Sequence, residues 1–384
     1  MQTTTPNQKN HLQPPPPSMD NIRAIKVLGS GATGTVFLAH DTVSDPLVVS
    51  PFALKVIPTS SSTTSSALRR AHWELTVLST LRPNPFLPTL IASFDTPFFF
   101  AYSLPFCPGS DLNVLRHRLP DRVFSESAVR FYLAETLSAL QHLHDSGIVY
   151  RDLKPENILI QSSGHIILAD FDLSRKLKPL PVNEEQENQQ LQLSCSKKRQ
   201  QKLLLRNNSK VTPTTNSATT NFEKSHSFVG TEEYVAAEVV RGEGHEFSVD
   251  WWALGVLAYE MLYGTTPFKG RDRKETFNNI VSKKAKFVGR RTELVDLIEL
   301  LLEKEPTKRL GYRGGAEEIK GHEFFRGVRW EMLTEVGRPP FVPPPWTAEE
   351  ERKGAVEGYR VSEYFENKVR ASPETAIDGE FKEF

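Results

Sequence analysis

The apolar positions between Ile22 and about Leu104 fall into short runs that are rich in β-branched residues and separated by turns. IRAIKVLG, TVFLAH and PFALKVI have the composition of strands. The stretch SALRRAHWELTVLSTL has a helical spacing instead. The apolar positions of this helix are Leu68, Trp73, Val77, Leu78 and Leu81. This pattern predicts a small β-rich region with one main helix.

After Cys107 the pattern becomes mainly helical. Ser125 is a good N-cap, and apolar residues then follow at helical steps until Gly147 ends the helix. Two strand-like segments, NILI and HIILAD, flank a loop region. VDWWALGVLAYEMLYG is apolar nearly all round, which predicts a buried central helix. LVDLIELLLEK predicts another helix, ending at Pro306. The second region should therefore be larger and helical.

Three segments break the globular pattern. Residues 1 to about 20 are polar and Pro-rich and should form a disordered arm. Residues from about 176 to 224 are rich in Gln, Asn, Ser and Thr, so we expect a disordered insertion inside the second region. Residues 326–384 contain RPPFVPPPW and end in FKEF, which predicts a tail held to the surface at a few anchors.

Composition excludes several classes of protein. Lys+Arg and Asp+Glu number 47 each, so the overall charge indicates neither a nucleic-acid nor a membrane partner. Cys107 and Cys195 are the two cysteines, which rules out a disulfide framework and favours a reducing cytoplasmic or nuclear compartment. The N-terminus has no apolar core of a secretory signal, and no run approaches the roughly 18 apolar residues of a transmembrane helix.

The spacing GxGxxG occurs at Gly29, Gly31 and Gly34, around Ser30 and before Val36. Dinucleotide-binding folds share this spacing, but there a helix follows the glycines. Here TVFLAH follows, which is a predicted strand. A glycine-rich hairpin lets backbone amides approach phosphates without obstruction by a Cβ. A tight turn that binds no ligand stays the alternative.

Lys55 lies in FALKVI, on the strand after that hairpin. A lysine that points inward from an apolar strand is costly unless it meets an anion. The phosphates of ATP together with Glu74, on the following helix, would satisfy it. Taken alone, Glu74 is better read as a solvated helix charge.

The segment YRDLKPEN is far more specific. Asp152, Lys154 and Asn157 are spaced as in the kinase catalytic loop. Asp152 would accept the proton of a substrate hydroxyl, and Lys154 would neutralise the transferred phosphoryl group. Asn157 would hold Mg²⁺ together with Asp170, a hard oxygen ligand in LADFDLS. The motifs predict transfer of the γ-phosphoryl group of Mg·ATP to Ser/Thr hydroxyls of proteins.

From Ile22 to Phe325 these residues resemble the eukaryotic protein kinase family. Several motifs are similar to those of the AGC group. One is Tyr150, at a position where most kinases carry His; the others are GTEEY, VDWWALG, and a tail with PPFVPP and FxxF. DFD in place of DFG, followed by an insertion, is typical of the plant-specific AGC kinases. Within them, PFCPGSDLNVLR, HSFVGTEEY and FRGVRWEMLTEVGRPPF resemble one plant subgroup.

The resemblance implies an α+β bilobal fold. It has a β-rich N-lobe, about 22–104, a helical C-lobe, about 108–325, and an AGC-type tail. ATP would bind between the lobes, its adenine against a hinge at Pro105, Phe106 and Cys107, with Leu104 behind it. Asp250 should cap the backbone of the catalytic loop, and Glu238 and Arg309 should form a buried ion pair.

Two residues depart from the wider kinase pattern. Asp172 replaces a flexible glycine, which puts in doubt whether the segment adopts a flipped, inactive conformation. Ala237 replaces a proline, which should loosen the substrate-binding segment. Neither change removes a catalytic group.

Substrate and regulatory residues are likewise implied by the family. Asp111, Glu156 and Glu260 match positions that face the residues before the phosphoacceptor, and would favour Arg two or three residues upstream. Separate surface acids are the alternative. Ser227, with Ser225 nearby, matches the activation-loop phosphosite, and a phosphate there would pair with Arg151.

The C-terminal Phe381 and Phe384 match a docking motif of the family. It would insert into a groove of the chain's own N-lobe or of an upstream phosphoinositide-dependent kinase. Many relatives carry a phosphorylatable residue after this motif; here none follows Phe384, so docking should work without it. A fraying tail is the alternative. The basic run KKRQQKLLLRNNSK predicts nuclear import or contact with anionic lipid, unless it is a solvated linker.

Two rival functions belong to other classes. A pseudokinase scaffold would bind nucleotide or partners without turnover, but Lys55, Asp152, Asn157 and Asp170 are all present. An interaction protein acting through its insertion would lose function when the insertion is deleted and keep it in Asp152→Asn. The complete set of catalytic groups favours an active kinase.

Overall fold

The computed structural model describes residues 18–31, 34–42, 51–59, 65–178, 223–336, 338–345 and 358–365. The chain divides into two compact units. The first contains Met1–Thr80, Pro88–Pro108 and Pro344–Phe384, and the second contains Leu81–Leu87 and Gly109–Pro343. Most of the predicted N-terminal arm, most of the insertion, and Phe381 and Phe384 lie outside the described residues.

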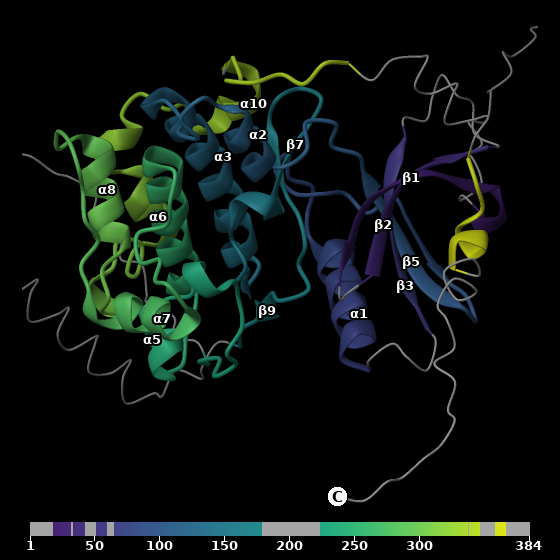
Figure 1. Ribbon diagram of the computed structural model, residues 1–384, viewed down its shortest axis with the longest axis horizontal. Helices are drawn as coiled ribbons and strands as arrows, with labels where there is room; N and C mark the ends of the chain where they lie inside the picture. Colours follow the sequence, from purple (N-terminus) through teal and green to yellow (C-terminus); the bar gives the residue numbers. More distant parts are fainter. Residues whose placement is uncertain are drawn as a thin grey trace, which may run out of the picture. The chain divides into compact units, whose positions relative to one another are not determined.

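The first unit is built on a five-stranded antiparallel sheet of order β1-β2-β3-β5-β4 (Figure 1). The strands are β1 (Ile22–Gly31), β2 (Gly34–Asp41), β3 (Phe52–Pro58), β4 (Ala92–Asp95) and β5 (Phe99–Pro105). The three strands predicted from the sequence are confirmed as β1, β2 and β3. Apolar residues of β1, β2, β3 and β5 form one core cluster on this sheet.

Helix α1 (Ser65–Thr80) contacts β3 and confirms the predicted helix of this unit. Its buried face is Ala67, Ala71, Glu74, Val77 and Leu78. Of the apolar positions that indicated the helix, Val77 and Leu78 lie on this face, whereas Leu68 and Trp73 are only half-buried. Positions 67, 71, 74 and 78 follow the helical repeat, so the buried face passes beside Leu68. Glu74 is therefore directed inward among apolar residues.

The described residues of the C-terminal tail are anchored at two places, one in each unit. In the first unit, Tyr359 and Ala24 exchange backbone hydrogen bonds of 3.0 and 2.9 Å, and the ring of Phe37 meets those of Tyr359, Tyr364 and Phe365. In the second unit, a Cβ on Gly164 would come within 2.5 Å of the Phe341 carbonyl oxygen. Glycine at that turn therefore permits the close approach of the tail.

The second unit is mainly helical (Figure 1). Its helices are α2 (Leu112–Arg118), α3 (Glu126–Asp145), α5 (Ala237–Arg241), α6 (Ser248–Tyr263), α7 (Arg273–Ser282), α8 (Glu293–Leu301), α9 (Gly315–Lys320) and α10 (Leu333–Val336). Two short antiparallel pairs accompany them, β6 (Ile148–Val149) with β9 (Arg175–Lys176), and β7 (Ile158–Ile160) with β8 (Ile166–Leu168). A sheet unit and a helical unit confirm the predicted α+β fold class.

The central helix predicted from VDWWALGVLAYEMLYG is confirmed as α6, which is buried on nearly all sides. The predicted end of the next helix is wrong, because α8 stops at Leu301, well before Pro306. Residues beyond Leu301 are engaged elsewhere: the Glu303 carbonyl accepts from Arg309 at 3.0 Å, and Lys304 donates to the Ile280 carbonyl. Among the described residues, no helix has the length and apolar character needed to cross a membrane.

Candidate active site

The glycine hairpin joins β1 and β2, and its last described pair is Gly31 opposite Gly34. Gly34 has φ +137°, and a Cβ there would lie 2.6 Å from the Val56 carbonyl oxygen, so the fold itself requires glycine. A Cβ on Gly29 or Gly31 would meet nothing within 4 Å. The fold does not explain these two glycines, and the space beside them is open to a ligand.

The other hairpin residues complete this part of the sheet. Ser30 Oγ lies 3.3 Å from Thr35 Oγ1, and Val36 stands opposite Lys55 in the pairing of β2 with β3. The predicted nucleotide residues Ser30 and Val36 are thus on the same two strands as the glycines, and Val36 lies on the strand next to Lys55.

Lys55 and Glu74 form a buried ion pair. Lys55 Nζ lies 2.6 Å from Glu74 Oε2, and the two side chains are 11% and 2% exposed. This burial excludes the reading of Glu74 as a solvated helix charge. Tyr102 stands opposite Lys55 in the pairing of β3 with β5, and burial raises its pKa well above the usual value. The pair therefore holds the lysine charge inside the unit with its own counter-ion.

The predicted hinge residues follow directly from β5. Leu104 and Pro105 stand opposite Ala53 and Phe52 at the end of the strand. Cys107 is buried, and burial raises the pKa of its thiol to about 12, so the thiol is neutral near pH 7. All the residues predicted to hold the nucleotide base and phosphates belong to the first unit.

In the second unit the three predicted catalytic-loop residues form one hydrogen-bonded cluster. The Asp152 carboxylate accepts from Lys154 Nζ at 2.8 Å and from Asn157 Nδ2 at 3.0 Å. A third donor, Thr231 Oγ1, lies 2.8 Å from Asp152 Oδ1 and also accepts from Lys154 at 3.0 Å. Thr231 was not predicted as a site residue. The signal that could have indicated it is its hydroxyl group within the GTEEY motif.

Asp250, on α6, holds the backbone of this loop in place. Asp250 accepts from the backbone N–H groups of Tyr150 and Arg151, at 2.8 and 2.7 Å, which confirms its predicted capping role. His144 Nε2 lies 2.7 Å from the same carboxylate. Arg151 has φ +71°, a left-handed conformation that is unfavourable for arginine. These bonds hold the strained loop in place.

Asp170 follows β8 and also has a left-handed backbone, with φ +56°. The N–H of Ala169 donates to the Asn157 carbonyl at 2.9 Å, which ties this segment to the catalytic loop. Tyr150 donates its hydroxyl hydrogen to the Ala169 carbonyl. Asp172 is not among the described residues with left-handed φ, so aspartate fits here without the freedom of glycine.

Two guanidinium groups bind the serines at the predicted phosphosite, Arg151 at Ser227 and Ser225, and Arg175 at Ser225. Arg151 donates to Ser227 Oγ at 2.6 Å and to Ser225 Oγ at 3.1 Å. Arg175 donates to Ser225 Oγ at 3.2 Å. Burial, and then the charge of Arg175, lower the pKa of Arg151 to about 10, which leaves it protonated near pH 7. The structure thus brings Ser227 and Arg151 together, as the sequence predicted.

The three predicted substrate carboxylates differ in their contacts. Asp111 caps α2 by accepting from Val114 N–H at 2.8 Å. Glu260 is buried, lies 3.0 Å from Arg116, and accepts from the Tyr234 hydroxyl, so the surface-acid alternative is wrong for it. Glu156 is exposed at the surface. Partial desolvation and the nearby charges of Glu260 and Asp111 raise its pKa, so the three carboxylates share one region.

The predicted structural ion pair is confirmed. Arg309 donates to both oxygens of Glu238, at 2.7 and 2.8 Å, and to the carbonyls of Ser248 and Glu303, at 2.8 and 3.0 Å. Its side chain is 0% exposed. Ala237, next to Glu238, is buried at the start of α5.

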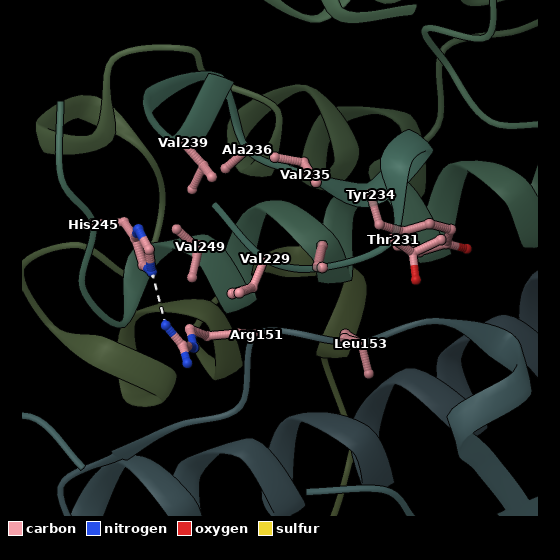
Figure 2. Close-up of a pocket in the computed structure, with 12 residues that line it drawn as sticks. Arg151, Leu153, Val229, Thr231, Tyr234, Val235, Ala236, Val239, His245 and Val249 are labelled. Atoms are coloured by element: carbon pink, nitrogen blue, oxygen red, sulfur yellow. Dashed lines mark hydrogen bonds between the residues drawn. The ribbon is translucent and has the colours of Figure 1, made fainter. Parts of the chain in front are cut away.

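Figure 2 shows a cavity beside the catalytic loop, where Arg151 and His245 approach each other at 3.5 Å. Valine side chains and Ala236 form much of its wall, with Thr231 at one end. Burial, and then the charge of Arg151, lower the pKa of His245 to about 4, so this histidine is neutral near pH 7. Asp152, Lys154 and Asn157 are not among the lining residues, but Thr231, which is bonded to Asp152, is one of them, so the cavity adjoins the catalytic cluster at Thr231.

Comparison with known proteins shows the family to which the chain belongs. The protein kinase domain family matches residues 22–190 and 209–325. The serine/threonine-protein kinase UCNL of Arabidopsis thaliana is 52% identical, covering 93% of this chain and 91% of its own. UCN from the same plant is 51% identical, covering 96% of both. OXI1, also from Arabidopsis thaliana, is 43% identical over 85% of this chain and 80% of its own. The predicted resemblance is confirmed: the chain belongs to the protein kinase family, among the serine/threonine kinases of the plant AGC group.

Proposed function

We propose that this serine/threonine kinase transfers the γ-phosphoryl group of Mg·ATP to hydroxyls that follow arginine in the protein substrate, as a step in plant signalling. Protein kinases use ATP and a divalent metal ion. The observation that carries the proposal is the cluster around Asp152, in which a buried carboxylate is held by three donors. Such a carboxylate is suited to orient a hydroxyl and to receive its proton.

The donor set fits Mg²⁺. The amide nitrogen of Asn157 donates to the backbone and side-chain oxygens of Asp152, so the amide oxygen is the atom with which Asn157 would bind a metal ion. Asp170 adds a carboxylate on the neighbouring segment. Mg²⁺ prefers oxygen ligands and takes few from the protein when phosphates supply others. Asn157 and Asp170 would hold the ion, which neutralises charge on the phosphates when it is bound.

The chain's own residues would then position the reactants. Asp152 orients the substrate hydroxyl and accepts its proton at a carboxylate oxygen. Lys154, bound to that carboxylate, places a positive charge where charge develops on the transferred group. In the first unit, the open space at Gly29 and Gly31, with Lys55 held by Glu74, is suited to the phosphates of the nucleotide.

The preference for arginine rests on Glu156. It is exposed and lies near two other carboxylates, and partial desolvation, followed by the repulsion of these carboxylates, raises its pKa. A guanidinium in that region would relieve this repulsion through charge-assisted hydrogen bonds. Glu260 is already bound to Arg116 and Tyr234. It would therefore attract the substrate arginine through its negative charge at a distance rather than through a direct hydrogen bond.

A positional peptide library tests this preference. The purified chain should select Arg two or three residues before the phosphoacceptor, and Glu156→Gln should weaken that selection. Glu331→Gln, which changes an exposed acid elsewhere in the same unit, is the matched control. Selection of proline or of acidic residues at these positions would contradict the proposal.

Phosphorylation of Ser227 is proposed as the activating event. A phosphate there would add nearly two negative charges beside Arg151 and close to Arg175, which already meet at Ser225. Mass spectrometry of active enzyme should find this phosphate, and Ser227→Ala should lower activity. Full activity of Ser227→Ala would argue against the switch.

Docking and location extend the proposal to residues that the structure does not describe. Phe381 and Phe384 would bind a hydrophobic groove of an upstream phosphoinositide-dependent kinase. Changing both to Ala should reduce Ser227 phosphorylation and binding to that kinase; wild-type levels of both would show that the motif does not dock. Neutralising Lys197, Lys198, Arg199 and Lys202 in a fluorescent fusion should alter its nuclear or membrane fraction, and an unchanged distribution would favour a solvated linker.

A further inference from the structure

The segment between α7 and α8, Lys283–Arg291, is a strongly basic loop that none of the proposed catalytic steps uses. Its sequence is KKAKFVGRR, with no acidic residue. The basic residues Lys283, Lys284, Lys286, Arg290 and Arg291 are all exposed. We call this segment the basic loop.

The backbone of the basic loop is fixed to α6. The Tyr259 hydroxyl donates to the Lys286 carbonyl at 2.7 Å, and the Tyr263 hydroxyl donates to the Val288 carbonyl at 3.3 Å. The ring of Phe287 lies between these anchors, 5.8 Å from Tyr259 and 6.4 Å from Tyr263. The loop is therefore a fixed feature of the surface.

This anchoring determines which side chains face outward. Successive side chains of an extended chain point to opposite sides, so turning Phe287 inward directs Lys286 and Val288 to the solvent. Val288 is 80% exposed, the highest value among the large exposed apolar residues that the structure describes. Gly289, with φ +95°, turns the chain directly after it. An aliphatic side chain thus protrudes between basic residues.

Most of the loop's charge is not neutralised within the unit. Arg291 is bound by Asp296 at 2.9 Å and Glu299 at 2.7 Å. In the described part of the chain, Lys283, Lys284, Lys286 and Arg290 have no ion-pair partner. The hydrogen bonds from Arg271 and, to a smaller extent, the charge of Lys283 lower the pKa of Glu275, and that carboxylate is bound to Arg271 at 2.9 Å. The basic loop therefore carries four such positive charges, three before Val288 in the chain and one after it.

We propose that the basic loop docks on the surface of an anionic phospholipid bilayer, with Val288 inserted among the headgroups. Basic side chains near such a surface are attracted to it, and an apolar side chain at the tip gains by leaving water. A nucleic acid would be bound better by an exposed aromatic ring, but Phe287 is packed against tyrosines. A bilayer, unlike an acidic protein, needs no preformed recess to receive Val288.

Sedimentation of the purified full-length chain with vesicles tests the charge component. The chain should bind vesicles that contain phosphatidylserine more tightly than vesicles of phosphatidylcholine alone. The variant Lys283→Gln/Lys284→Gln/Lys286→Gln should bind the anionic vesicles about 100-fold more weakly, at roughly fivefold for each charge removed. The variant Lys308→Gln/Arg313→Gln/Arg329→Gln removes three exposed charges elsewhere in the same unit and is the matched control. Equal weakening by both variants would overturn the proposal in favour of a non-local charge effect.

The variant Val288→Ser tests insertion, because it leaves the charge unchanged. It should weaken vesicle binding by about tenfold and leave binding to the soluble polyanion heparin unchanged. Vesicle binding at the wild-type level in this variant would overturn insertion. Loss of heparin binding in the triple loop variant without loss of vesicle binding would point to a nucleic acid or another polyanion instead. All three variants should phosphorylate a soluble peptide at the wild-type rate, which shows that they are folded.

Discussion

Two buried charge clusters of the second unit, around Asp152 and around Arg309, use similar groups in different ways. Arg309 is fully buried and makes two parallel bonds to Glu238 and two more to backbone carbonyls. Asp152 is held by single bonds from three side chains, one of which, Lys154, is 22% exposed at its side chain. The first cluster is closed, whereas the second borders on solvent.

The difference indicates separate roles. A bidentate, fully buried Arg–Glu pair is rigid, and losing one partner leaves a buried charge without compensation. Single bonds at the edge of solvent are exchanged more readily for bonds to a substrate. We therefore expect changes at the Arg309 cluster to affect stability, and changes at the Asp152 cluster to affect turnover.

The largest expected effect is on turnover. Asp152→Asn should lower kcat by about 10²- to 10⁴-fold, the usual contribution of a positioned base. ATP affinity and the unfolding temperature should stay near the wild-type values, because the amide keeps the shape of the side chain. Steady-state kinetics, nucleotide binding and calorimetry measure the three quantities. If Asp152→Asn lost stability along with activity, the two clusters would not differ in their roles in turnover and in stability.

Glu238→Ala should act in the opposite way. It leaves Arg309 buried without its carboxylate, so the free energy of unfolding should fall by about 3–5 kcal/mol. Denaturant titration measures this loss. The kcat of the protein that is still folded at low temperature should stay close to wild type. A stable Glu238→Ala protein with a low kcat would show that this pair acts in catalysis.

Thr231→Val sharpens the comparison within the catalytic cluster. Because it removes one donor from a charged acceptor, worth about 1.5–3 kcal/mol, kcat should fall by about 10- to 100-fold. Thr231→Ser keeps the hydroxyl and should restore most of the rate. If both variants lose only stability, Thr231 is a structural residue.

A smaller effect concerns pH and a third buried cluster. Glu135 Oε1 lies 2.5 Å from His165 Nδ1, and burial raises the Glu135 pKa from 4.5 to about 7. The folded state therefore binds more protons than the unfolded state between these values, so stability falls as pH rises through that window. Relative to Glu135→Gln, the wild-type free energy of unfolding should decline between pH 4.5 and about 7. Parallel pH profiles of the two proteins would show that burial does not raise the pKa of the Glu135 carboxyl group.

Sequence reasoning predicted which polar residues lie together better than it predicted the packing. Asp152, Lys154 and Asn157 were predicted as a set because phosphoryl transfer needs these groups at fixed spacing, and they do form one hydrogen-bonded cluster; Glu238 and Arg309 came from the family resemblance. Thr231 was missed because one hydroxyl in a motif does not show which carboxylate it meets. The burial of Ala67 and Ala71 on α1 was not predicted because alanine carries little hydrophobic signal, although small residues permit close packing.

The sequence also did not predict that the carboxylate oxygens of Glu260 are already engaged within the protein. The bonds of Glu260 to Arg116 and Tyr234 join residues far apart in the chain, and periodicity does not predict such pairings. The family resemblance placed Glu260 near the substrate, but it did not show that its oxygens were already engaged.

The most direct test is transfer of labelled γ-phosphate from Mg·ATP by the purified wild-type chain to a serine peptide with arginine three residues upstream. The account predicts phosphoserine in the peptide, with turnover that requires the metal ion and is lost in Asp152→Asn. A chain that binds ATP and Mg²⁺ but leaves the peptide unlabelled would be a nucleotide-binding scaffold, and that result would contradict the account.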